Sequence, residues 1–216
     1  MPLSQLEPRA VWTAFAELNA VPRPSKREEQ VQAFAVQLGE SLGLDTAKDA
    51  VGNVRIIKPA SPGMEAAPTV VIQAHLDMVC QQNEGTGHDF DKEGIDMYTE
   101  DGWVKARGTT LGADNGIGVA FAIATLRSSE MIHPAIEVLF TSDEETGMTG
   151  ALGLETRWIK GKYLLNIDTE DDRELTIGCA GGIDVTARGK ASYRPAPVED
   201  PMGFRLTVKG LTGGHS

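Results

Sequence analysis

Four short segments of this chain carry imidazole or acidic side chains beside apolar runs. His75 and Asp77 lie two residues apart in an extended apolar segment, and Asp114 lies in a glycine-rich turn. The triplet Asp143-Glu144-Glu145 follows one apolar run, and Asp168 ends another. Neutral imidazoles and ionised carboxylates bind divalent metals, and a carboxylate near the second ring nitrogen orients the imidazole. Adjacent carboxylates in a cleft repel each other, and a cation removes that penalty. The four segments together therefore predict a shared metal site.

Each of these segments also has a purely structural interpretation. A single His-x-Asp is more often a surface or core pair, and an acidic triplet is usually a solvated loop. Asp114 is a residue type that commonly caps helices. The stretch 112–118 is glycine-rich, but it does not fit the G-x-G-x-x-G pattern and places a carboxylate where a pyrophosphate would lie, which argues against a dinucleotide loop. Only the combination of all four segments favours the metal site.

The elements that would position these residues alternate between helices and strands. Apolar residues at helical spacing predict helices over 6–18 and 31–38, with Ser25 as the predicted N-cap of the second helix. A buried helix is predicted over 119–126, strands over 54–57, 69–79, 135–140 and 163–168, and a loop over 80–102. We expect an α/β fold, a central mixed β-sheet with helices on both faces. Three of the acidic segments then lie at strand ends, where such sheets bind ligands.

The character of the chain changes after residue 186. Residues 192–201 contain three prolines and are typical of a linker, and residues 204–210 are predicted to begin a new strand. We therefore predict a first domain over 1–186 and the start of a second domain over 187–216.

Composition narrows the classes of partner. The chain has 216 residues, a formal net charge of −11 and a pI near 4.8, and we find no basic patch. Nucleic acid and anionic membrane surfaces are therefore not expected as partners. Its apolar runs are all far shorter than the ~20 residues that span a bilayer. Cys80 and Cys179 form no C-x-x-C pair, which favours reduced thiols and a cytoplasmic location.

The motifs of the chain, taken in order, resemble those of the M20 metallopeptidases. The resemblance extends from about residue 5 to the last residue. It is carried by the segments Gln73–Val79, Gly108–Gly118, Asp143–Gly147, Asn166–Asp168, Gly178–Gly182 and Gly213–His215.

The resemblance implies a catalytic pair of divalent cations, with zinc the usual metal and manganese or cobalt as alternatives. By motif, His75 and Asp168 would bind one cation, Glu145 the other, and Asp114 would bridge them. The peptide bond between Asp114 and Asn115 is expected to be cis.

The same resemblance implies roles for three further residues. Asp77 would orient the imidazole ring of His75. Glu144 would be the general base, which takes a proton from the attacking water and later passes it to the leaving amine. His215 matches a histidine of the lid domain that helps bind the scissile carbonyl oxygen.

Members of this family are about twice as long as this chain, and their lid domain follows the residues that correspond to 186 here. The chain is thus expected to be the N-terminal part of such an enzyme, with the first strand of an α+β lid. A histidine ligand of the second metal has no match in this sequence. We therefore expect one metal to bind well, the second poorly, and the chain to be a weak or inactive peptidase. The full-length form is expected to be a homodimer.

The function implied is metal-dependent hydrolysis of dipeptides, including those that end in histidine. Two alternatives remain open. One keeps the same metal site and changes the substrate to an N-acyl amino acid. The other is a metal-binding domain without catalysis.

Overall fold

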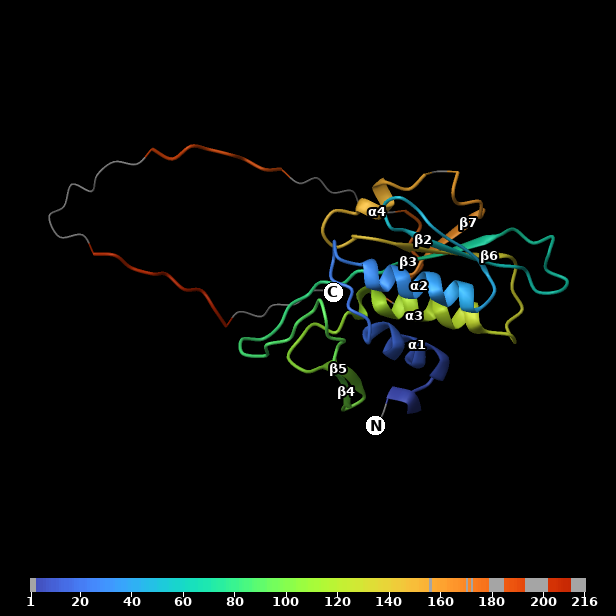
Figure 1. Cartoon of the computed structure of the whole chain (residues 1–216), viewed down its shortest axis with the longest axis horizontal. Helices are drawn as coiled ribbons and strands as arrows, with labels where there is room; N and C mark the ends of the chain where they lie inside the picture. The colour runs from blue at the N-terminus through green and yellow to red at the C-terminus, as the bar shows by residue number, and fades with distance from the viewer. Residues whose placement is uncertain are drawn as a thin grey trace. The chain divides into compact units, whose positions relative to one another are not determined.

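The computed structural model describes residues 3–155, 157–169, 171, 173–178, 185–192 and 202–210 (Figure 1). The chain divides into two units, Met1–Thr169 and Glu170–Ser216. The helices and strands of the described residues all lie in the first unit. In contrast to the expected strand over 204–210, these residues contain no strand. The domain boundary after residue 186 stays a prediction.

The first unit is built on a five-stranded mixed sheet. Its strands are β1 (Asp45–Lys48), β2 (Val54–Lys58), β3 (Val70–His75), β6 (Ile136–Thr141) and β7 (Tyr163–Asn166), in the spatial order β1-β2-β6-β3-β7. The pairs β1/β2 and β2/β6 are antiparallel, whereas β3 is parallel to both β6 and β7. The carboxyl ends of β3, β6 and β7 therefore meet at one edge of the sheet.

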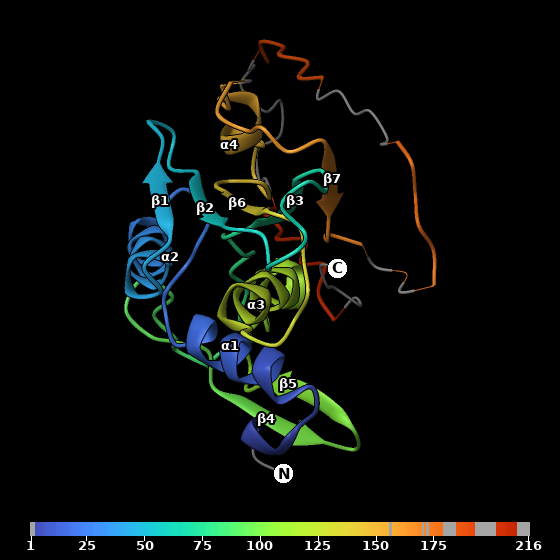
Figure 2. The same cartoon turned by 90° about the vertical axis from the view of Figure 1, so that its right-hand side faces the viewer.

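Helices lie on both faces of this sheet. Helices α1 (Arg9–Asn19), α2 (Glu29–Ser41) and α3 (Ala113–Arg127) lie on one side of the sheet, and the single turn α4 (Thr149–Leu152) lies on the other, in both views (Figures 1 and 2). A 3₁₀ turn, η1 (Leu3–Gln5), precedes α1. The expected α/β class is confirmed. Among the described residues, no helix combines the length and apolar character that crossing a membrane requires.

The hydrophobic core lies between the sheet and the three larger helices. Helix α3 packs against α1 on one side and against β3 on another, and its residues are apolar nearly all round, as expected for a buried helix. Alternate residues of the strands point into this core. The fully buried members include Phe15, Leu18, Val31, Val54, Ile56, Ala74, Leu76, Val119, Val138 and Phe140.

Two expectations about local structure were wrong in detail. The strand predicted over 69–79 ends at His75, because the chain there leaves the sheet to form backbone contacts with the segment around Pro24. Ser25 does not cap α2, which begins at Glu29 without a side-chain cap. The Ser25 hydroxyl instead donates to Asp77, at 2.7 Å.

A second small sheet begins within segment 80–102, which was predicted as a loop, and ends just beyond it. Strands β4 (Met97–Glu100) and β5 (Trp103–Ala106) form an antiparallel hairpin. Its two-residue turn, Asp101-Gly102, has positive φ at both positions, the conformation that matches the twist of a hairpin.

Substitution of Phe140 tests where the hydrophobic core lies. Its side chain is fully buried on β6, whereas Phe121 on α3 is 46% exposed. We expect Phe140→Ala to lower the free energy of unfolding in urea by roughly 3–5 kcal/mol, because it leaves a cavity. Phe121→Ala, the matched control, should cost less than about 1 kcal/mol. Equal losses would contradict this assignment of the core, and Phe140→Leu replaces the alanine variant if that variant does not fold.

Candidate metal centre

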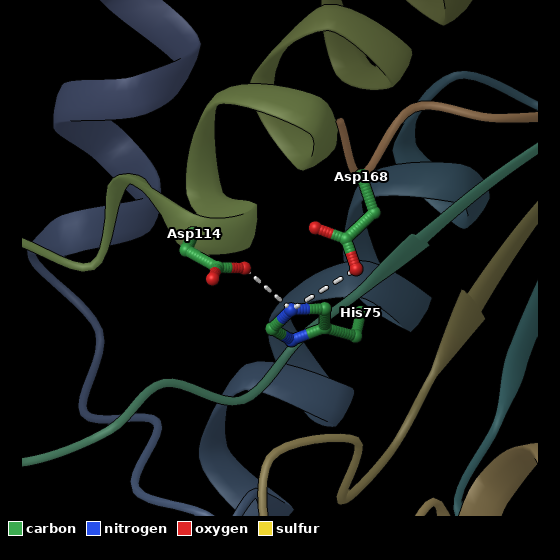
Figure 3. A group of neighbouring side chains, drawn as sticks. All are labelled: His75, Asp114 and Asp168. Carbon is green, nitrogen blue, oxygen red and sulfur yellow. Dashed lines mark hydrogen bonds and ion pairs between the residues drawn. The ribbon is translucent and has the colours of Figure 1, made fainter. Parts of the chain in front are cut away.

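One imidazole and two carboxylates converge at the edge where the parallel strands end. His75 is the last residue of β3, Asp114 is the second residue of α3, and Asp168 lies just beyond β7. The Nε2 atom of His75 lies 2.9 Å from Oδ1 of Asp114 and 3.8 Å from Oδ2 of Asp168 (Figure 3). All three offer ligand atoms within 4.8 Å of one another. The geometry is that of a candidate site for one cation.

The acidic triplet supplies a second candidate group around the same imidazole. The loop after β6 brings Glu144 and Glu145 to His75, with ligand atoms again within 4.8 Å of one another. Oε2 of Glu144 lies 4.0 Å from Nε2 of His75. The histidine is fully buried, whereas the Glu144 side chain is 33% exposed. Small molecules from solvent can thus reach the carboxylate.

Asp77 connects the histidine to the acidic loop. Its Oδ1 lies 3.2 Å from Nδ1 of His75 and accepts the backbone N–H of Glu144 at 3.0 Å. Its Oδ2 accepts the backbone N–H of Glu145 at 3.2 Å and the hydroxyl of Ser25. A single buried carboxylate therefore fixes the orientation of the ring and the course of the loop that carries two further candidate ligands.

Asn115 links the start of α3 to the end of β7. Its side-chain amide donates to the carbonyl of Ile167 at 3.1 Å and to Oδ1 of Asp168 at 2.6 Å. The preceding peptide bond, between Asp114 and Asn115, is cis, as expected. Asp168 thus has one oxygen held by an amide and the other directed toward His75.

The ionisation of the cluster follows from burial and mutual charge. Burial lowers the pKa of His75, but the hydrogen bond and charge of Asp77, together with Asp168, outweigh it and raise this pKa to about 9. Burial raises the pKa of Asp77, yet the hydrogen bonds from His75, Glu144 and Ser25 lower it to about 2. Burial and the neighbouring carboxylates raise the pKa of Glu144 and of Asp168.

The chemistry of this donor set fits divalent cations. Four carboxylates besides Asp77 lie around one imidazole, and burial together with neighbouring negative charges raises the pKa of Glu144 and of Asp168. The imidazole is buried and already oriented through its Nδ1 atom by Asp77, which leaves Nε2 facing the carboxylates. Mixed oxygen and nitrogen donors of this kind suit zinc, manganese and cobalt.

The structure thus brings six of the seven residues singled out in the sequence to one place. Those six are His75, Asp77, Asp114, Glu144, Glu145 and Asp168. His215 lies outside the described residues. The contributions of Ser25 and Asn115 were missed. The sequence around Ser25 favoured a helix N-cap instead. Asn115 could have been considered as a residue that supports the site, because it directly follows Asp114.

An open α/β sheet that gathers an imidazole and carboxylates at its strand ends is typical of metal-dependent hydrolases. The model of Peptidase family M20/M25/M40 matches residues 71–204, and the chain belongs to this family. The family is one of metal-dependent peptidases.

Three relatives are similar to the chain in sequence and, for two of them, in structure. The cytosol non-specific dipeptidase of Escherichia coli (strain K12) is 48% identical over 99% of this chain and 44% of its own length. The crystal structure of aminoacylhistidine dipeptidase from Vibrio alginolyticus matches with a TM-score of 0.78 and 50% identity, over 80% of this chain and 35% of that one. Aminopeptidase PepT from Bacillus cereus matches with a TM-score of 0.63 and 26% identity, over 75% and 43% of the two chains. The chain therefore spans less than half the length of these relatives.

A buried carboxyl supports the acidic loop from the side of α2. Glu28 is only 4% exposed, and its Oε1 accepts the backbone N–H of Asp143 at 2.6 Å. Burial, and then the charges of Asp77 and Asp143, raise the pKa of Glu28 to about 7, although that hydrogen bond lowers it.

Glu28→Gln should make the metal-free chain more stable at alkaline pH. Because the pKa of Glu28 rises from 4.5 to about 7 on folding, the folded state binds the proton more tightly, and wild-type stability falls as pH rises through this window. Glutamine keeps an acceptor oxygen and has no charge to bury. The difference in unfolding free energy between variant and wild type should grow by up to about 3 kcal/mol between pH 5 and pH 8.

Urea unfolding of EDTA-treated protein at both pH values measures this difference. Glu29→Gln, an exposed neighbour at the start of α2, is the control and should show no such growth. A Glu28→Gln difference that is the same at both pH values would contradict the buried, uncharged carboxyl.

Proposed function

We propose that this chain provides the metal centre of a dipeptidase that hydrolyses dipeptides, including those with a C-terminal histidine. The convergence of His75, Asp114 and Asp168 with the Glu144–Glu145 pair carries the proposal. Family membership and the names of the dipeptidases from Escherichia coli and Vibrio alginolyticus support the reaction and its substrate class.

The residues would divide between two cations. His75 and Asp168 would hold one, Glu145 would contribute to the other, and Asp114 would lie between them. We propose zinc as the metal, and the donor set also accommodates manganese or cobalt. When bound, the cations would lower the pKa of the attacking water and stabilise the negative charge that develops on the scissile carbonyl oxygen.

Two carboxylates would act without needing to bind metal. Asp77 holds Nδ1 of His75, so that Nε2 faces the cluster. Glu144 is partly exposed, lies at the edge of the cluster and has a raised pKa, which suits a general base. Its carboxylate would accept a proton from the attacking water and return it to the nitrogen of the leaving amine.

The relatives also support proposals about the location and the substrate of the longer protein. The name of the Escherichia coli dipeptidase supports a cytoplasmic location. The expected partner is a small peptide, and the role of His215 in binding its carbonyl oxygen stays part of the proposal. The homodimer is proposed for the longer protein on the family resemblance alone.

Asp114→Ala should abolish high-affinity zinc binding. After equilibration with zinc and desalting, the wild-type chain should retain at least one zinc ion, measured by atomic emission. The variant should lose it, because Asp114 is the carboxylate nearest to Nε2 of His75, at 2.9 Å. The control is Asp45→Ala. Asp45 is an exposed residue of β1, the outermost strand on the side of the sheet away from β3 and β7, and this variant should retain zinc. Zinc retained equally by all three proteins would contradict the centre.

Glu144→Gln should separate metal binding from catalysis. We expect the zinc-loaded chain to hydrolyse Xaa-His dipeptides slowly, since a histidine ligand of the second metal has no match in this sequence. The variant should keep its zinc and lose about 10²- to 10⁴-fold in turnover, which is the contribution of a positioned general base. Turnover that survives in Glu144→Gln would show that another group is the base. A higher rate with N-acyl amino acids than with dipeptides would instead support the amidohydrolase alternative.

A further inference from the structure

Arg23 is the largest buried side chain among the described residues, and it joins the two segments that carry the candidate ligands. Its Nη1 donates to the carbonyl oxygens of Leu76 and Asp77, both at 3.2 Å. Its Nη2 donates to the carbonyl oxygen of Gly112 at 2.5 Å. The first two carbonyls directly follow His75, and the third precedes Asp114 by two residues.

Further contacts hold the guanidinium itself in place. Nη2 of Arg23 also donates to Oδ1 of Asn19, at 2.8 Å, and the amide of Asn19 donates to the carbonyl of Leu111 at 3.0 Å. The backbone carbonyl of Arg23 accepts the N–H of Met78 at 3.1 Å. Helix α1, the end of β3 and the start of α3 are therefore tied together through one side chain.

Two glycines of the 108–118 stretch leave room for this guanidinium. A Cβ atom at Gly112 would lie 2.4 Å from Nη2 of Arg23, and one at Gly116 would lie 2.7 Å from the same atom. Gly112 also has φ +69°. The backbone before and after Asp114 thus approaches Arg23 more closely than any other residue type would allow.

We propose that Arg23 is a positioning residue for the metal centre, which fixes the separation between the His75–Asp77 segment and Asp114. The inference rests on the proposed metal centre. Three donated hydrogen bonds to backbone carbonyls, made by a rigid planar group, determine how far apart these segments lie. Loss of such an outer contact typically weakens metal binding about 10- to 100-fold.

If Arg23 acted through its charge alone, its removal would change zinc affinity in the opposite direction. The guanidinium faces the charges of Asp77, Asp114 and Glu145, and with a pKa lowered by burial to about 10 it is charged at neutral pH. A fixed positive charge repels an incoming cation. If charge were its only contribution, Arg23→Met would bind zinc more tightly than wild type, and Arg23→Lys would bind it equally well. Positioning predicts weaker binding by both variants, because neither side chain reaches all of these carbonyls.

The test measures zinc affinity of the full chain by competition with a chromophoric chelator, together with the visible spectrum of the cobalt-loaded protein. Both Arg23 variants should bind zinc about 10- to 100-fold more weakly, with an altered cobalt spectrum that reports a changed ligand geometry. Circular dichroism before titration confirms that each variant is folded.

The matched control is Arg55→Met. Arg55 donates to the carbonyl of Trp158 and lies over its ring, away from the candidate ligands. It should lose stability and keep wild-type zinc affinity and cobalt spectrum. If neither Arg23 variant folds, Asn19→Ala tests the positioning role instead, because it removes one acceptor of the guanidinium. We expect it to weaken zinc binding as well, by a smaller factor.

The outcomes separate the two proposals. Unchanged or tighter zinc binding in folded Arg23 variants, or in Asn19→Ala when those variants do not fold, overturns the positioning role and leaves the metal centre standing. Weakening in Arg55→Met as large as in Arg23→Met also overturns it, because the effect would then reflect general destabilisation. A wild-type chain that binds no zinc contradicts the metal centre and the inference with it.

Discussion

Asp77 is fully buried at the end of β3, and its two oxygens accept hydrogen bonds from Ser25 and from the backbone of Glu144 and Glu145. A buried carboxylate is tolerated only when its oxygens are paired, so these donors must lie where Asp77 needs them. The parallel register of β3 and β6, with His75 opposite Thr141, makes this possible, because it brings the two strand ends level. The positions of the imidazole and of the acidic loop both depend on this interaction.

The pairing of Asp77 also determines how the cluster handles its charge. In the metal-free chain the pKa of His75 is raised to about 9, so the protonated imidazole is a positive charge among the surrounding carboxylates, in addition to the guanidinium of Arg23. A cation that binds Nε2 must displace that proton, which couples metal binding to proton release. The ligands are nevertheless held by contacts with the rest of the fold, such as the amide of Asn115 on Asp168.

The sequence predicts most strands of the sheet, and the candidate ligands it singles out lie close together, because apolar strands and the residues at their ends leave strong local patterns. It failed where a local signal was weak or had two meanings. The hairpin of β4 and β5 was missed because each strand is only four residues long and mixes apolar with polar side chains, although the turn Asp101-Gly102 is a recognised hairpin signal. Ser25 has the sequence context of a helix cap, yet its hydroxyl is used by Asp77, more than fifty residues away. Contacts of this kind depend on tertiary packing, which no local pattern specifies.

The glycine-rich stretch shows how a sequence pattern acquires a physical meaning only in the fold. Its glycines suggest a loop that approaches a phosphate, but the atoms that a Cβ would meet are protein atoms. At Gly118 an added Cβ would lie 2.0 Å from Oδ1 of Asn115 and 2.9 Å from the carbonyl of Ile167. At Gly112 it would meet the guanidinium of Arg23. These glycines therefore give space to buried polar side chains on both sides of Asp114. The same small residues that serve ligand approach in nucleotide-binding loops serve here to let the protein hold its own acidic residue in place.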